Sequence, residues 1–182
     1  MRNILITLAL LLTAVTPGWA ADNKDDAALN HHYEHFIAAF ATLDTQPLAT
    51  IYADDADYIP EQQTGDIVTG KTDILALYQK FFERIQKRKA HIEVDFRIVR
   101  RLRQGAQATD ISYYLVRFYP PVETEEPVSE FAGKMVVVSE KNAQGQWQWK
   151  VDISNRASPT LFFNAEPKAP LYYGNHLKPL TK

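Results

Sequence analysis

The chain has 182 residues, a formal net charge of −2 at pH 7 and no cysteine. A net charge this small gives no strongly basic face, so nucleic acid is not an expected partner. Without cysteine there are no disulfides and no thiolate metal ligands. The length suits a single domain whose own core must hold it together.

The N-terminus has the layout of a secretory signal peptide over residues 1–20. Arg2 supplies a positive charge, residues 4–15 are apolar or threonine, and Gly18 and Ala20 stand at the −3 and −1 positions of a cleavage site. The apolar run has 12 residues, short of the ~20 that a membrane-spanning helix needs. We therefore expect an exported protein, periplasmic in a bacterium, with no membrane span after cleavage.

Residues 21–27 are polar and are expected to form a loose lead-in. Apolar residues then recur at spacings of three and four in residues 29–40 and again in 74–85, which predicts two amphipathic helices. Pro47 suits the first turn of a short helix between them that continues to residue 52.

Residues 56–60 follow as a short strand that Pro60 ends. Asp54 and Asp55 are expected to turn the chain into it, because short carboxylates can bond nearby backbone amides. The stretch from residue 61 to residue 70, with glycines at 65 and 70, is predicted to be a loop.

After residue 91 the hydrophobic period changes to two, which predicts strands. Four antiparallel strands are expected, the last two joined by a hairpin loop at "KNAQG". Helices followed by a run of strands indicate an α+β fold, with the helices packed on one face of a curved sheet. The predicted strands cover residues 91–98, 107–119, 130–140 and 146–154.

The last segment, residues 158–182, holds four prolines and shows no sustained period. It is too apolar for a free disordered tail, since it carries Leu161, Phe162, Phe163, Leu171, Tyr172 and Tyr173. We expect it to pack on the domain or on a partner.

Three stretches resemble the cone-shaped α+β barrel superfamily that includes SnoaL-like cyclases, ketosteroid isomerase, scytalone dehydratase and nuclear transport factor two. They are "AAFATLDTQPLATIYADDADYIP" (38–60), "TGKTDILALYQKFF" (69–82) and "NAQGQWQWKVDISN" (142–155). The resemblance covers residues 29–157. It implies three helices closing a strongly curved, mainly antiparallel sheet into a cone with an internal pocket. The resemblance says less about function, since the fold occurs both in enzymes and in proteins that only bind a ligand.

The resemblance also implies a homodimer through the outer face of the sheet. Tyr113, Tyr114 and Tyr119 are candidates for that interface, because aromatic residues are enriched where subunits meet.

Steroid isomerisation in this superfamily needs an aspartate base and an oxyanion hole made by a tyrosine and a protonated aspartate. The matching positions here are Pro60, Phe36 and Val137, none of which can accept a proton or donate a side-chain hydrogen bond. Glu61 would act only if the strand slipped by one residue. The resemblance therefore argues against ketosteroid isomerase activity.

Two polar residues remain as candidates for chemistry. Tyr58 shares a strand face with position 60, so its phenol can donate to a substrate carbonyl, or it is a core residue whose hydroxyl a neighbour satisfies. By the superfamily's strand phase, Asp152 faces the pocket with Ser154. Desolvation there would raise its pKa into the range useful for acid/base work. The alternative is a hydrogen-bonded structural aspartate.

Neither metal-like cluster is complete. His31 and His35 have helical i, i+4 spacing but no third ligand. Asp54, Asp55 and Asp57 lack the glycine-bearing loop and distal glutamate of a calcium site. With no phosphate loop, dinucleotide fingerprint or nucleophile motif, no metal and no cofactor are expected.

These features predict a protein that binds a small apolar molecule in an aromatic-lined pocket. One hypothesis is a cofactor-free lyase, isomerase or cyclase with Asp152 as acid/base and Tyr58 as donor. The others are a periplasmic carrier or sensor using the same pocket, and a protein-interaction module whose cone is filled by its own side chains. The expected lining is Phe36, Phe40, Tyr58, Tyr78, Phe82, Met135, Val137 and Trp149.

Overall fold

The computed structural model describes residues 18–61 and 65–180, with side chains from residue 24 on. The predicted signal peptide lies almost entirely outside the described residues. Within the part of the chain that is described, no helix combines the length and the apolar character needed to cross a membrane.

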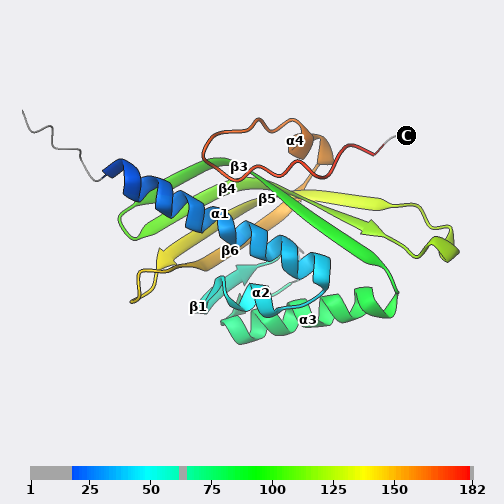
Figure 1. The fold of residues 1–182 in the computed structure, drawn as a ribbon. Coiled ribbons are helices and arrows are strands. Elements are labelled where there is room, and N and C mark those ends of the chain that lie inside the picture. The colour runs from blue at the N-terminus through cyan, green and yellow to red at the C-terminus, as the bar shows by residue number, and fades with distance from the viewer. Residues whose placement is uncertain (1–17, 62–64, 181–182) are drawn as a thin grey trace, which may run out of the picture.

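The α+β fold class is confirmed, with the first three helices on one side of a six-stranded sheet and the short last helix on the other (Figure 1). The strand order is β2-β1-β6-β5-β4-β3, and neighbouring strands are antiparallel except for β1 and β6. The helices are α1 (Gly18–Thr42), α2 (Gln46–Ala49), α3 (Lys71–Lys87), the 3-10 turn η1 (Val122–Thr124) and α4 (Pro159–Phe163). The strands are β1 (Tyr52–Ile59), β2 (Val68–Thr69), β3 (His91–Gln104), β4 (Gln107–Tyr119), β5 (Ser129–Lys141) and β6 (Trp147–Ala157).

The expected loose lead-in at residues 21–27 is wrong, because α1 already includes it. Side chains of this stretch are tied to the sheet. Asp25 accepts hydrogen bonds from Lys141 and from the Trp147 indole, both at 3.0 Å. These contacts fasten α1 to the sheet at Asp25, and periodicity along the sequence does not reveal them.

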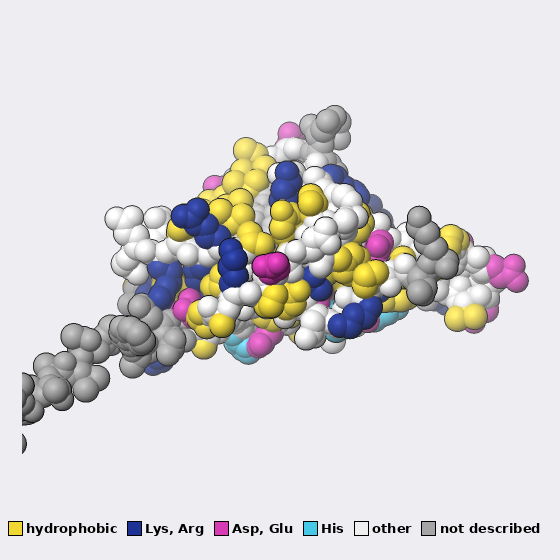
Figure 2. Space-filling model, turned by 90° about the horizontal axis from the view of Figure 1, so that it is seen from above, with side chains coloured by type: hydrophobic (Ala, Val, Ile, Leu, Met, Phe, Trp, Pro, Cys, Tyr) yellow, Lys and Arg dark blue, Asp and Glu magenta, His cyan; other side chains and the backbone are white. Residues whose placement is uncertain are grey.

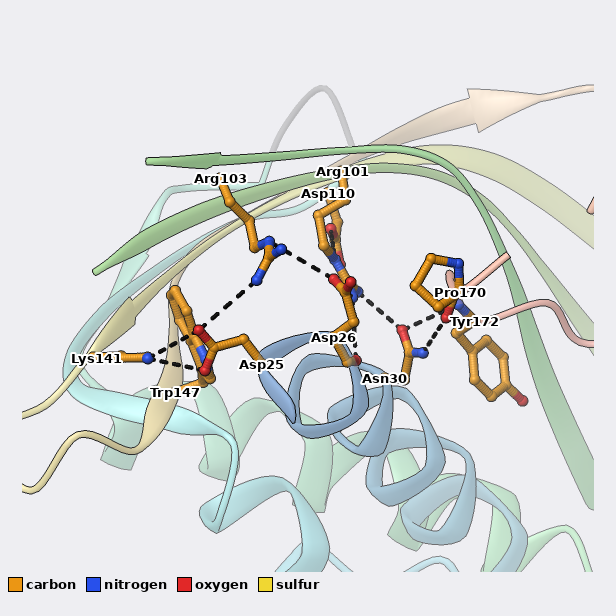
Figure 3. Close-up of polar contacts among 10 residues, drawn as sticks. All are labelled: Asp25, Asp26, Asn30, Arg101, Arg103, Asp110, Lys141, Trp147, Pro170 and Tyr172. Carbon is orange, nitrogen blue, oxygen red and sulfur yellow. Dashed lines mark hydrogen bonds and ion pairs between the residues drawn. The ribbon is translucent and has the colours of Figure 1, made fainter. Parts of the chain in front are cut away.

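A buried polar network joins α1 to the sheet beside these contacts (Figure 3). The Arg101 guanidinium donates to both carboxylate oxygens of Asp110 at 2.7 Å, and also to Asp26 and Asn30 on α1 at 3.1 Å. Asn30 in turn accepts from the backbone N–H of Tyr172 at 3.0 Å. One cation therefore links α1, β3 and β4, and through Asn30 the C-terminal tail.

The prediction that Asp54 and Asp55 turn the chain is also wrong, because both lie inside β1. This strand pairs in parallel with β6, which lies far along the chain, and antiparallel with β2 in the stretch predicted to be a loop. The exposed carboxylates of Asp54 and Asp55 are ion-paired with Lys71 and Lys150. β6 pairs with β1 at Tyr52 and again from Asp57 on, with a register shift between them, so the strand continues through the two aspartates.

The C-terminal tail lies against the sheet on the side opposite α2 and α3 (Figure 1). Its backbone pairs with β3, where Gly174 N–H donates to Phe96 at 2.8 Å and Ile98 N–H donates to Tyr172 at 3.1 Å. A β-carbon at Gly174 would lie 1.6 Å from Asp95 Oδ1, so only glycine permits this approach. The tail thereby covers the free edge of β3, which would otherwise offer unpaired backbone groups.

Arg97 of β3 fixes the tail in place. Its guanidinium donates to the carbonyls of Phe162, Phe163 and Gly174 at 2.8 to 3.0 Å and lies over the rings of Phe162 and Tyr173. Beneath it, buried side chains of the tail and the outer sheet face form one apolar cluster. That cluster consists of Leu115, Ala132, Phe162 and Leu177. Viewed from the tail side, hydrophobic side chains gather over the middle of the face, with lysines and arginines around them (Figure 2).

Candidate functional site

A cavity of about 310 Å³ lies between the helices and the inner face of the sheet. Aromatic and aliphatic side chains make most of its wall, and a few polar groups converge on it, which is the usual composition of a small-molecule site. The polar members are Tyr58, Glu61, Arg84, Tyr114, Asp152 and Ser154. The apolar members, with Tyr78, are Phe36, Phe40, Leu77, Phe81, Val94, Phe96, Val116, Phe131 and Met135.

Asp152 stands on β6 and is only 1% exposed. The Tyr52 hydroxyl donates to its Oδ2 at 2.7 Å, whereas its Oδ1 is buried and has no hydrogen-bond partner among the described residues. Burial raises the pKa of Asp152 to about 7, and the hydrogen bond from Tyr52 opposes the rise. A carboxyl group titrating near neutrality can both take and return a proton at physiological pH.

Tyr58 lies directly opposite Asp152 in the parallel pairing of β1 with β6. Burial is the main cause of its raised pKa, the charge of Asp152 adds to it, and an interaction with Ser154 opposes it. Tyr58 therefore stays protonated and can donate a hydrogen bond. Its ring centroid is 5.9 Å from that of Tyr78, whose phenol also interacts with Tyr52. A series of interacting phenols thus runs from Tyr58 through Tyr78 to Tyr52, which donates to Asp152.

Glu61 lines the same cavity, contrary to the expectation that it would do so only after a register slip. The strand ends at Ile59, so the alternation of faces no longer governs the residue after Pro60. The Tyr114 hydroxyl donates to Oε2 of Glu61 at 2.6 Å, and Arg156 pairs with Oε1 at 2.8 Å. The proline was the signal available in the sequence, because it commonly marks where strand pairing stops.

Tyr114 therefore points into the cone, and its expected place at an outer dimer interface is wrong. Its neighbour Tyr113 faces the other way and packs against the tail cluster. Alternation along β4 explains the difference, since consecutive side chains of a strand point to opposite faces.

Five of the eight expected lining residues line the cavity, and so does Asp152. The five are Phe36, Phe40, Tyr58, Tyr78 and Met135. Phe82, Val137 and Trp149 do not line it, although all three are buried in the core at 0 to 1% exposure.

The two aromatic residues of this set pack against side chains that do line the cavity. Trp149 stacks on Phe36 with ring centroids 5.7 Å apart. Phe82 packs edge-on against Phe40 at 5.3 Å. The sequence pattern predicted their burial, but it did not indicate which buried faces adjoin the cavity.

The acidic stretch of β1 does not converge on a common point. Asp54 and Asp55 each pair with a lysine, and Asp57 accepts a hydrogen bond from a threonine hydroxyl. On α1, His31 is exposed and His35 is half-buried, with ring centroids 4.2 Å apart. In residues 24–61 and 65–180, no three side chains of the metal-binding types come together.

No family model matches the chain, and no curated protein matches it in sequence. Solved structures do match. An NTF2-like protein with a cystatin-like fold from Novosphingobium aromaticivorans aligns with a TM-score of 0.65 at 11% identity, over 80% of this chain and 92% of its own. The chain has the NTF2-like cone fold.

Two further matches have the same fold. A ketosteroid isomerase-like protein from Erwinia carotovora atroseptica is 19% identical over 75% of this chain and 99% of its own, with a TM-score of 0.59. A candidate scytalone dehydratase from N. aromaticivorans is 16% identical over 76% of this chain and 89% of its own, with a TM-score of 0.61. At these identities the likeness establishes the NTF2-like fold and leaves the chemistry to be argued from the cavity.

Proposed function

We propose that this NTF2-like protein binds a small, ring-bearing apolar molecule in the cavity and catalyses a cofactor-free proton transfer on it, as an isomerase or lyase. The observation that carries the proposal is the carboxyl group of Asp152, buried in an aromatic cavity with one oxygen unpartnered. Acids and bases whose pKa lies near the working pH are the most effective proton carriers.

The proposed chemistry needs a substrate with a carbonyl group. The Asp152 carboxylate takes a proton from the carbon next to the carbonyl, and the electron pair of that C–H bond forms an enolate. Tyr58 donates a hydrogen bond to the developing oxyanion, which stabilises it in a site of low polarity. If a carbon–carbon double bond is conjugated with the enolate, Asp152 returns its proton to the far carbon of that bond, which moves the double bond and gives an isomer. If the β-carbon bears a hydroxyl group, the proton goes to that departing hydroxyl, giving water and a new double bond.

Two structural neighbours support this class of reaction without deciding between its forms. One is described as ketosteroid isomerase-like and another as a candidate dehydratase of the NTF2-like family from Streptomyces avermitilis. The steroid isomerase arrangement itself is not proposed. The three positions that would supply its groups hold Phe36, Pro60 and Val137, and Val137 does not even line the cavity.

The test uses 2-tetralone, a two-ring ketone with acidic protons beside its carbonyl. Purified protein in deuterated buffer near neutral pH should speed the exchange of these protons, followed by proton NMR. We expect Asp152→Asn to bring the rate close to that of buffer. Tyr58→Phe should lower it by roughly 100-fold, the usual effect of losing one oxyanion donor. Binding of 2-tetralone without any exchange would instead favour the carrier or sensor hypothesis.

We also propose that the protein is exported to the periplasm. The support is the N-terminal sequence alone, a charged start followed by a short apolar run and small residues. Cell fractionation with N-terminal sequencing tests it, and the mature chain should begin at Ala21. A periplasmic protein that retains Met1, or a cytoplasmic one, would contradict the proposal.

A further inference from the structure

We infer that Glu61 determines specificity by selecting ligands that present a hydroxyl group at its end of the cavity. The ligand class is then neutral, ring-bearing and hydroxylated. This inference deepens the proposed function, since it concerns the same cavity, and it stands on contacts that the proton-transfer chemistry does not use.

The carboxylate of Glu61 is fixed in position but not saturated. One oxygen accepts from the Tyr114 hydroxyl and the other is paired with Arg156. A carboxylate has about four lone-pair sites, so each oxygen can accept one more hydrogen bond. Its side chain is only 10% exposed. A ligand that fills the cavity therefore has to replace any water that Glu61 holds there.

This geometry favours binding of a ligand that can donate a hydrogen bond to Glu61. A hydroxyl group gives Glu61 a charge-assisted hydrogen bond, which is stronger than a neutral one. A ligand of the same shape without the hydroxyl leaves a desolvated charged acceptor unmet, and buried groups left unpaired in this way discriminate strongly against such analogues.

The charges around Glu61 narrow the ligand further. Arg156 already balances its charge, so this end of the cavity does not call for a cationic ligand. A ligand carboxylate placed here would meet the Glu61 carboxylate. Arg84 is the cationic group that also lines the cavity, but it is exposed and lies on α3 near Phe81. A solvated arginine gives weaker selection than a buried carboxylate.

One ligand can contact both carboxyl groups of the cavity, those of Asp152 and Glu61, together with Tyr58. Tyr58, Asp152 and Glu61 all line the same cavity. Burial is the main cause of the raised pKa of Tyr58, and the charges of Asp152 and Glu61 both add to it. A molecule with its carbonyl at Tyr58 and Asp152 would thus present a hydroxyl group further along the same cavity, toward Glu61.

The experiment compares binding of 2-naphthol, 2-methoxynaphthalene and 2-naphthoate, measured by calorimetry. We expect wild type to bind 2-naphthol at least about ten-fold more tightly than 2-methoxynaphthalene, as one charge-assisted hydrogen bond implies. The preference should shrink to a few-fold in Glu61→Gln, which keeps a neutral acceptor, and vanish in Glu61→Met. The exposed Glu123→Gln is the matched control and should keep the wild-type preference.

Circular dichroism identifies any variant that has lost its fold, and Arg156→Gln then serves as the second variant, because it loosens Glu61 without removing it. A preference that survives in Glu61→Met, or no preference in wild type, would overturn the inference. Tightest binding by 2-naphthoate would also overturn it, because Arg84, which attracts anions, would then determine which ligand binds. Because 2-tetralone has no hydroxyl group for Glu61, its exchange is measured at concentrations that saturate the protein. A failed exchange at saturation beside an intact naphthol preference would count against the proposed function alone.

Discussion

The Tyr52 hydroxyl donates a 2.7 Å hydrogen bond to Oδ2 of Asp152, and both side chains are buried among aromatic rings. Burial disfavours the charged carboxylate, whereas the hydrogen bond favours it. Their balance leaves the pKa of Asp152 at about 7. Tyr52 is therefore a positioning residue that tunes the proposed proton carrier.

Replacing Tyr52 by phenylalanine should raise the pKa of Asp152 further, by about one unit or more, because the carboxylate loses its only donor among the described residues. A carbon-13 NMR titration of the labelled carboxyl measures this directly. Tyr33→Phe is the matched control, since Tyr33 donates to a different buried carboxylate, Asp110, at 3.0 Å. An unchanged titration in Tyr52→Phe would contradict the tuning role.

The same carboxyl group should make stability depend on pH. Its pKa in the folded protein is about 7, above the unfolded value of 3.8. The folded state thus holds the proton more tightly, so the stability that this group contributes is fully present below pH 4 and is lost as pH rises toward 7. The decline attributable to this group is at most about 4 kcal/mol. Asp152→Asn should lack this part of the pH dependence.

Urea unfolding of both proteins between pH 4 and pH 8 measures the effect as a difference. The comparison matters because His32 acts in the opposite sense. Burial lowers the pKa of His32 from 6.5 to about 4, so its contribution is lost as pH falls through that range. Both proteins contain His32, so its contribution cancels when the two pH curves are subtracted. A wild type and an Asp152→Asn variant with parallel pH curves would show that Asp152 is not perturbed.

Arg101 should be far more important for stability than its neighbour Arg103 on β3. The Arg101 side chain is 3% exposed and spans α1, β3 and β4, whereas that of Arg103 is 23% exposed and lies 3.8 Å from Asp25 and from Asp26. Arg101→Met leaves buried carboxylates uncompensated and should cost about 3–5 kcal/mol in unfolding free energy. Arg103→Met should cost less than ~1 kcal/mol. Similar losses in chemical denaturation would contradict the network.

Arg97 should control whether the tail stays on the sheet. Arg97→Gln removes hydrogen bonds to three tail carbonyls and should uncover the apolar outer face around Leu115. We expect faster proteolysis within the tail and self-association that increases with protein concentration, seen by light scattering. Arg100→Gln, at an exposed position of the same strand, is the control. A variant that behaves like this control would show that Arg97 does not hold the tail.

The fold was readable from hydrophobic periodicity wherever a helix or strand buries one continuous face. Residues 74–85 gave α3 in this way. Periodicity failed where long-range contacts decide the structure. Asp25 and Asp26 fasten α1 to the sheet through Lys141 and Arg101. Asp54 and Asp55 lie in β1, which pairs with the distant β6 at Tyr52 and from Asp57 on.

The candidate site was readable only in part. Strand phase in the resembling superfamily placed Asp152 toward the pocket, and Asp152 does line the cavity. Nothing in the sequence linked Tyr52 with Asp152, since the two are brought together only when β1 and β6 pair. The position of Glu61 in the cavity was missed, because the prediction assumed that side chains keep alternating between faces past Pro60. The strand ends before that residue, at Ile59.

Proton exchange from 2-tetralone as a function of pH tests the central claim most directly. If Asp152 is the proton carrier, the rate in wild type should rise with pH as the carboxyl ionises, with a midpoint near 7. The same profile should be absent in Asp152→Asn. Exchange at the wild-type rate in Asp152→Asn, or a wild-type profile without a transition near neutrality, would contradict the account.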